Sequence, residues 1–168
     1  TDNLETMTET RIMGWHSLLF SSLAGLKPKR IGEYRDAPVY ISRGNGKDSR
    51  IIYEGLPAVR IEEEMGRLVD FINEDNEQRP LVKSAIVSLW FLCIHPFEDG
   101  NGRISRALSD YVISKGFGVT HRVYSMSSLI LKHRNAYYQL LNAISGQAQS
   151  LDLTQWITWN INIAVQAK

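Results

Sequence analysis

The sequence predicts a mainly α-helical, compact bundle that carries one short β-hairpin. Apolar residues recur at spacings of three and four over much of the chain, which is the period of helices that bury one face. Two short runs rich in β-branched and aromatic residues flank Gly44-Asn45-Gly46, a sequence typical of a tight hairpin turn. The 168 residues are near the usual length of one domain, so we expect a single domain over residues 1–168.

The chain is expected to begin with a helix over residues 10–23, because four apolar residues recur on one side of it: Ile12, Trp15, Leu18 and Leu19. We interpret His16 in this helix as a packing or capping residue rather than a ligand. Residues 27–35 are basic and punctuated by proline and glycine, which predicts a solvated surface loop. The hairpin should follow over about residues 38–55.

Further helices are predicted after the hairpin. Residues 61–73 form an amphipathic pattern with three glutamates in the first turns, where carboxylates suit the positive end of the helix dipole. Residues 81–94 are apolar on nearly every side, which predicts a buried helix, and Pro96 disfavours helical geometry at the residue before it. The same spacings predict a helix that ends near Lys115-Gly116, and then helices over 129–144 and 154–165.

Composition excludes several classes of protein. The formal net charge is +1, so no overall field favours a nucleic acid or an acidic membrane surface, and neither is expected as a partner. Cys93 is the single cysteine, which excludes a disulfide within the chain. No apolar run reaches membrane-spanning length, and we expect a cytoplasmic protein. Aromatic residues near the termini leave a homodimer open as an alternative to core packing.

The most specific stretch is HPFEDGNGRIS at residues 95–105, followed at once by Arg106; residues 95–106 are called the motif loop below. The predicted elements place it between two helices, so its second half opens a helix. Backbone N–H groups in the first turn of a helix lack intrahelical partners and carry the positive end of the dipole. Gly100 and Gly102 would let an anion approach this turn, and Asn101 could cap the helix or donate its amide to a phosphate oxygen.

The charged residues of the motif loop strengthen this prediction. Arg103 and Arg106 lie three apart on one helix face, so both can point at one anion. Asp99 is the one acid beside these cations, and a hard divalent cation that bridges it to phosphate would explain its presence. His95 is placed to accept a proton from a hydroxyl. Each feature alone is common in ordinary loops, but the combination predicts a metal-bound polyphosphate beside a general base.

The run His95-Pro96-Phe97-Glu98-Asp99-Gly100-Asn101-Gly102-Arg103, with Arg106, resembles the HPFx[DE]GNGRxxR signature of Fic-domain proteins without a departure. The resemblance extends over most of the chain, to residues 14–20, 31–35, 122–127 and 137–138. In these segments the chain is similar to a bacterial subgroup in which a separate N-terminal segment precedes the Fic core. It implies a Fic-type helical bundle. Fic proteins mostly transfer AMP from ATP to a target protein's hydroxyl, and some members move other phosphate-linked groups or remove AMP.

The resemblance also implies roles for individual residues. His95 would be the general base that deprotonates a serine, threonine or tyrosine hydroxyl of the target. Asp99 would hold Mg²⁺ against the nucleotide phosphates. Arg103 would grip the outer phosphates, and Arg106 would contact the γ-phosphate. Three residues between them would form the anion cradle: Gly100, Asn101 and Gly102.

The resemblance is less specific outside the motif loop. It places Tyr137 and Tyr138 near the nucleoside, although paired tyrosines on an apolar helix are also typical of a core. Fic proteins use a hairpin flap to hold the target by strand pairing. Three residues at the end of the second strand are therefore candidates for lining the target channel, with a simple turn as the alternative: Tyr53, Glu54 and Gly55. Phe97 is expected to be a core anchor.

Many Fic proteins carry an inhibitory helix with the pattern [ST]xxxE[GN]. Thr1 and Glu5 have the required spacing, but Thr6 stands where glycine or asparagine belongs. We therefore expect this chain to be a core fragment of a longer chain, with the inhibitory segment N-terminal to Thr1.

The leading functional hypothesis is an adenylyltransferase that uses Mg²⁺ and ATP to modify a target protein. The first alternative is removal of AMP from a modified protein, or transfer of another phosphate-linked group. The second is a non-catalytic module that binds a nucleotide or a protein. A pure binder has no need of His95, which favours the enzyme.

Overall fold

The computed structural model confirms the expected fold class. Helices dominate, and one antiparallel pair of strands extends from the bundle. The described part of the chain is residues 5–21, 28–43, 50–75, 79–118, 130, 132–133, 136–137, 139–140 and 152–166. The elements are α1 (Glu9–Ser21), β1 (Tyr40–Arg43), β2 (Arg50–Glu54), the 3₁₀ turn η2 (Ala58–Arg60), α2 (Ile61–Asn73), α3 (Pro80–Ile94), α4 (Asn101–Phe117) and α7 (Thr154–Gln166).

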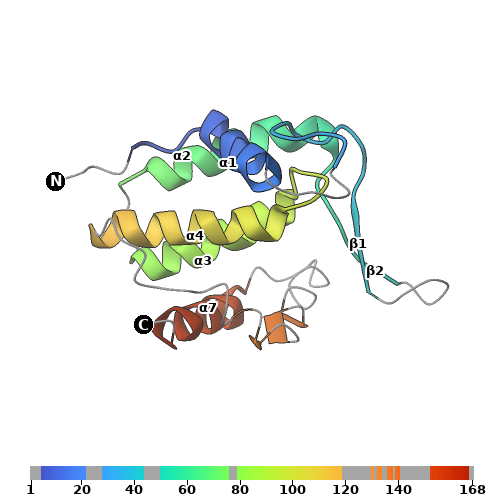
Figure 1. Ribbon diagram of the computed structural model, residues 1–168. Helices are drawn as coiled ribbons and strands as arrows, with labels where there is room; N and C mark the ends of the chain where they lie inside the picture. Colours follow the sequence, from blue (N-terminus) through green and yellow to red (C-terminus); the bar gives the residue numbers. More distant parts are fainter. Residues whose placement is uncertain are drawn as a thin grey trace.

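Helices α3 and α4 form the centre of the bundle and run side by side (Figure 1). Small polar side chains line their contact: the Ser88 and Ser105 hydroxyls lie 2.9 Å apart. Near the far end, a Cβ added to Gly116 would lie 2.4 Å from Cγ of Pro80, so the glycine permits the close approach. The loop between the two helices is the motif loop, and the rigid pair fixes both of its ends.

Two hydrophobic clusters pack on opposite sides of α3. One includes Phe91 and joins α3 to α1, α2 and α4; the other includes Leu89 and joins α3 to α7. The buried Trp156 of α7 donates its indole N–H to the Ala85 carbonyl at 2.8 Å. Burial on two sides explains why the sequence of α3 is apolar on nearly every face.

Strands β1 and β2 form the expected hairpin, with Ile41 opposite Tyr53 and an irregularity between Ile41 and Ser42. The turn residues 44–49 lie outside the described residues. The pairing continues past β2, where Gly55 donates its N–H to the Val39 carbonyl at 2.9 Å. The hairpin leaves the bundle at the end where α3 turns into α4 (Figure 1), which places its base beside the motif loop.

The structure refines the end of one predicted helix and corrects the predicted environment of one residue. Helix α4 continues past Gly116 to Phe117, and Gly118, with φ of 64°, forms its C-cap, because Gly116 is needed against Pro80 instead. Arg35, expected on a solvated loop, is only 3% exposed. Of the helix expected over 129–144, most residues lie outside the described part of the chain.

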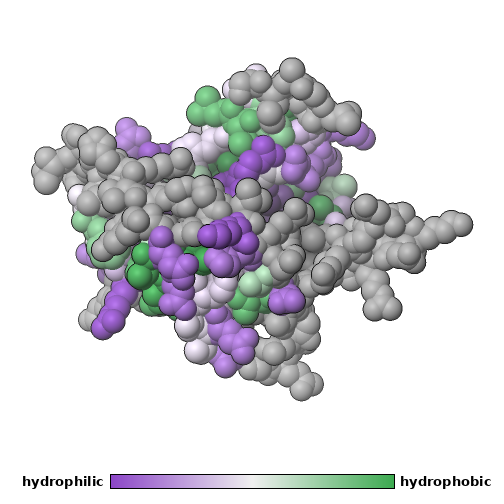
Figure 2. All heavy atoms as spheres, turned by 60° about the horizontal axis from the view of Figure 1, so that its bottom comes forward, coloured by the Kyte–Doolittle hydropathy of each residue, from purple (hydrophilic) through white to green (hydrophobic). Residues whose placement is uncertain are grey.

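The described surface residues mix hydrophilic and hydrophobic side chains (Figure 2). On the face shown in Figure 2, hydrophilic and hydrophobic side chains occur in small interspersed groups. Within the described segments, no helix has the length and apolar character required to cross a membrane.

Candidate active site

The motif loop is held by its own buried side chains. Phe97 is fully buried and its ring stacks on His16, with 4.0 Å between the ring centroids. The buried Asn101 side chain accepts a hydrogen bond from the Phe97 N–H at 3.0 Å and donates to the Phe97 carbonyl at 2.7 Å. The prediction that Phe97 is a core anchor is confirmed. These contacts close the loop between α3 and α4 into one compact turn.

His95 follows the last residue of α3 and adopts a left-handed backbone conformation, with φ of 51°. Its Nδ1 lies 3.3 Å from the carbonyl oxygen of Leu92, so Nδ1 carries the proton in this contact. In the neutral ring Nε2 is then the acceptor. Burial lowers the pKa of His95 below its usual value, and the charge of Arg35 acts in the same direction. The imidazole is therefore neutral at physiological pH and can accept a proton through Nε2.

Asp99 directly precedes Gly100, the N-cap of α4, and its carboxylate is exposed. Its Oδ1 accepts the Gly100 N–H at 2.6 Å, and its Oδ2 lies 3.3 Å from Nη2 of Arg103. No group of three or more potential metal-ligating residues occurs in the described segments. A lone carboxylate fits Mg²⁺, which takes one or two protein carboxylates and completes its shell with substrate phosphates and water. Asp99 is therefore a candidate ligand for a cation that a phosphorylated ligand would bring with it.

The first turn of α4 has the backbone geometry of a helix N-terminus at the place where we expect an anion to bind. Gly100, with φ of 83°, is the N-cap, and its carbonyl accepts the N–H groups of Arg103 and Ile104 at 3.0 Å. The N–H groups of Asn101 and Gly102 precede these first intrahelical bonds and lie where a helix favours an anion. The interpretation of Asn101 as a side-chain cap is wrong, because its amide is bonded to Phe97 instead. Its expected role in binding phosphate remains a prediction for the backbone N–H.

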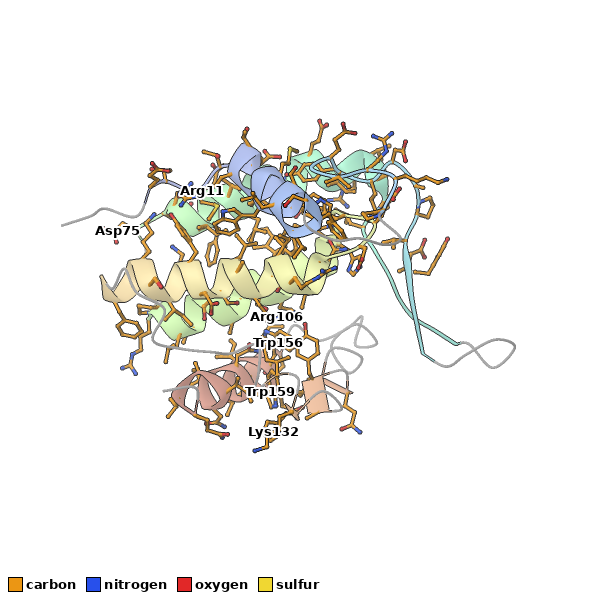
Figure 3. All side chains as sticks on the ribbon, in the orientation of Figure 1. Arg11, Asp75, Arg106, Lys132, Trp156 and Trp159 are labelled. Carbon is orange, nitrogen blue, oxygen red and sulfur yellow. The ribbon has the colours of Figure 1, made fainter. Side chains whose placement is uncertain are left out.

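The two arginines of α4 have different neighbours. The Arg103 guanidinium lies 5.0 Å from the ring centroid of Phe20 and close to Asp99. Arg106 passes beside the backbone of Gly102, where an added Cβ would lie 3.4 Å from its Nη1. Figure 3 labels Arg106 between α4 and α7, and its Nε is buried without a hydrogen-bond partner among the described residues. An unpaired buried donor beside a glycine cradle is a polar group that an anion would satisfy.

The other predicted site residues divide into two groups. At the hairpin base, Gly55 lies directly against His95, since an added Cβ would be 3.3 Å from the His95 Cβ. Glu54 is exposed, and Tyr53 of β2 lies opposite Ile41 of β1. Tyr137 is buried against Trp156 and Trp159, with ring centroids 5.6 and 5.7 Å away. Tyr138 lies outside the described residues.

Sequence reasoning did not assign a role in the site to Arg35. Its buried guanidinium donates to the carbonyl of His95 at 2.7 Å. The available signal was the segment Ile31-Gly32-Glu33-Tyr34-Arg35, which carries part of the family resemblance. Of the two interpretations of His16, packing or capping, packing is confirmed: the imidazole is fully buried and bonded to the motif loop.

Comparisons with known proteins agree with this architecture. The model of the Fic/DOC family matches residues 6–113. A protein adenylyltransferase fic-1 from Caenorhabditis briggsae is 27% identical over 95 residues, which are 55% of this chain and 17% of that protein. The crystal structure of a Fic family protein from Desulfovibrio desulfuricans G20 superposes with a TM-score of 0.75 at 26% identity, over 99% of this chain and 47% of the other.

A Fic domain-containing signaling protein from Bacteroides thetaiotaomicron VPI-5482 has the same fold, with a TM-score of 0.72 at 20% identity. It is matched over 99% of this chain and 62% of its own length. The chain therefore spans less than two thirds of the length of each of these relatives.

Proposed function

Because this chain belongs to the Fic/DOC family, we propose that it transfers AMP from Mg-ATP to a hydroxyl side chain of a target protein. The observation that carries the proposal is the position of a neutral imidazole and a helix N-terminus on one short loop. His95 lies at the start of this loop, directly after α3, and α4 begins at its other end and carries Arg103 and Arg106. The adenylyltransferase name of a distant relative supports the same activity.

In the proposed reaction, Nε2 of His95 accepts the proton of the target hydroxyl. The hydroxyl oxygen then forms a bond to the α-phosphorus of ATP, and the bond from that phosphorus to the bridging oxygen of the β-phosphate breaks. Pyrophosphate leaves with the electron pair of that bond. Base catalysis of this kind contributes typically ~10²- to 10⁴-fold to the rate.

The other residues of the motif loop stabilise charge and orient the nucleotide. The N–H groups of Asn101 and Gly102 face the phosphates, and the guanidiniums of Arg103 and Arg106 hold the outer ones. Mg²⁺ bound to Asp99 would supply electrostatic stabilisation of the phosphate oxygens. Asp99 itself is oriented by the Gly100 N–H, so its carboxylate needs little rearrangement to accept the cation.

The test is intact-mass analysis after incubation with ATP and Mg²⁺, alone and with a cell lysate. We expect an AMP-sized adduct on the protein or on a lysate protein, and its absence with His95→Ala. His133→Ala is the matched control, because His133 is exposed and lies outside the motif loop. An equal adduct with His95→Ala would contradict the proposed base. If the protein removes AMP from a premodified protein and transfers none, its proposed activity becomes AMP removal in place of AMP transfer.

A further inference from the structure

Arg35 joins three separate segments around the candidate base. Its side chain is buried, and its contacts with the described residues include hydrogen bonds to four backbone carbonyls. Nε donates to His95 at 2.7 Å, and Nη1 donates to Ala37 at 2.8 Å. Nη2 donates to Leu56 at 2.5 Å and to Ile94 at 3.2 Å. We propose that Arg35 is a positioning residue that sets the orientation of His95 and couples it to the base of the hairpin.

The backbone of His95 has a left-handed conformation that its surroundings stabilise. A left-handed conformation is unfavourable for a non-glycine residue, so the surroundings must hold it. Arg35 contacts three successive carbonyls at this point: its side chain bonds to Ile94 and His95, and its N–H donates to Pro96 at 2.9 Å. Carbonyls at a helix C-terminus carry partial negative charge and favour a cation. One residue therefore fixes the turn from which the imidazole projects.

The imidazole ring of His95 is oriented by a contact with α3. Nδ1 of His95 donates to the Leu92 carbonyl, one turn earlier in α3, and leaves Nε2 as the proton acceptor. The ring makes this contact from the left-handed backbone by turning back toward α3. If the turn at His95 relaxes, the Nδ1 contact is lost and the tautomer is no longer determined.

The base of the hairpin also contacts the guanidinium of Arg35. Leu56 lies two residues after the end of β2, and its carbonyl accepts a hydrogen bond from Nη2 of Arg35. At Gly55, an added Cβ would lie 2.8 Å from Nη2 of Arg35 and 3.3 Å from Cβ of His95. The end of β2 thus touches both residues with no space between them. A target segment that orders or displaces β2 would shift the acceptors of Arg35 and thereby the imidazole.

The guanidinium is required because the acceptors lie in several directions. Arginine presents five N–H donors in a rigid planar fork, whereas lysine has one flexible ammonium group. Lysine at this position keeps the positive charge but cannot reach all the carbonyls at once. Arg35→Lys therefore separates geometry from charge, and Arg35→Met removes both.

The experiment compares wild type, Arg35→Lys, Arg35→Met and Gly55→Ala. Arg30→Met is the matched control, because Arg30 lies in the same loop but pairs with Glu33 and Asp36 at the surface. Mg-ATP affinity is measured by calorimetry, AMP transfer by mass, and the His95 tautomer by ¹⁵N chemical shifts of the imidazole. A thermal melt verifies folding for each variant.

We expect Arg35→Lys to lower kcat roughly 10²-fold, as a small misplacement of a catalytic group does. Mg-ATP affinity should stay unchanged, since the α4 N-terminus is intact, and the ¹⁵N shifts should move from one tautomer to a mixture. Gly55→Ala should change the tautomer in the same direction from the hairpin side. Arg30→Met should match wild type in all readouts.

This inference rests on the proposed function, but the tautomer readout does not require any AMP transfer. If the wild type transfers no AMP, the proposed function fails, while the ¹⁵N shifts still test the coupling. A folded Arg35→Lys with the wild-type tautomer would overturn the inference. If Arg35→Met does not fold, Arg35→Lys and Gly55→Ala still decide the question.

Discussion

The buried imidazole of His16 lies 3.0 Å from the backbone carbonyl of Asp99, 83 positions away in the chain. Its Nδ1 accepts the Gly32 N–H at 2.9 Å, so Nε2 carries the proton and donates to Asp99. The ring also stacks on Phe97. His16 therefore ties α1 and the segment around Gly32 to the motif loop, at the residue whose carboxylate we expect to hold the metal.

Replacing His16 by alanine should destabilise the protein by ~3 kcal/mol. The change leaves the Gly32 N–H and the Asp99 carbonyl without their partner and opens a cavity beside Phe97. Urea unfolding of His16→Ala measures this cost, and the exposed His133→Ala serves as the control. Equal unfolding midpoints for the two variants would exclude a structural role of His16 in the loop.

Stability should fall in mild acid because His16 and His95 are both buried. Burial lowers the pKa of each below the usual 6.5, so the unfolded chain binds protons more readily than the folded one. Stability is then complete above about pH 6.5 and declines as the pH falls below this value toward the lowered folded-state pKa. Urea midpoints at pH values across this window measure the slope. His95→Gln should make the slope shallower, and an unchanged slope would contradict the assignment.

Two glycines should respond in opposite ways to alanine. Gly100 has φ of 83° and an added Cβ would lie 2.9 Å from Leu19, so Gly100→Ala should destabilise the protein and weaken Mg-ATP binding. Gly14 lies in α1 with open space around it, and Gly14→Ala should stabilise by roughly 0.5–1 kcal/mol. Thermal melts of both variants give the comparison. A stability gain at Gly100 would show that the backbone there tolerates a side chain.

Replacing Arg106 by methionine should separate nucleotide binding from stability. Its Nε is buried without a described partner, so the folded protein loses little when the guanidinium is removed. ATP affinity should fall roughly 10- to 100-fold if the side chain binds the γ-phosphate, whereas AMP affinity should be unchanged. Calorimetry with ATP, ADP and AMP measures the difference, with the exposed Arg67→Met on α2 as the control. Equal losses for ATP and AMP would place Arg106 away from the terminal phosphate.

Local patterns were sufficient to predict most of the elements. The amphipathic spacing predicted α2 at residues 61–73 as the structure has it, and the two-sided apolar pattern predicted α3 within one residue. Pro96 and the glycines predicted the turn between α3 and α4. The predicted end of α4 near Lys115-Gly116 stops one residue short of the observed end at Phe117, because Gly116 serves the contact with Pro80 rather than the helix end. A single sequence does not distinguish these two uses of glycine.

The sequence by itself determined the helices, the hairpin and the chemical content of the motif loop, because periodicity, turn residues and helix termini are local properties of the chain. Only the tertiary structure decided how the loop is held. Arg35 and His16 bond to backbone groups 60 and 83 positions away, and backbone acceptors leave no trace in the identity of the residue that carries them. A basic residue in a polar segment therefore predicts a surface, and folding alone shows that Arg35 is buried beneath His95.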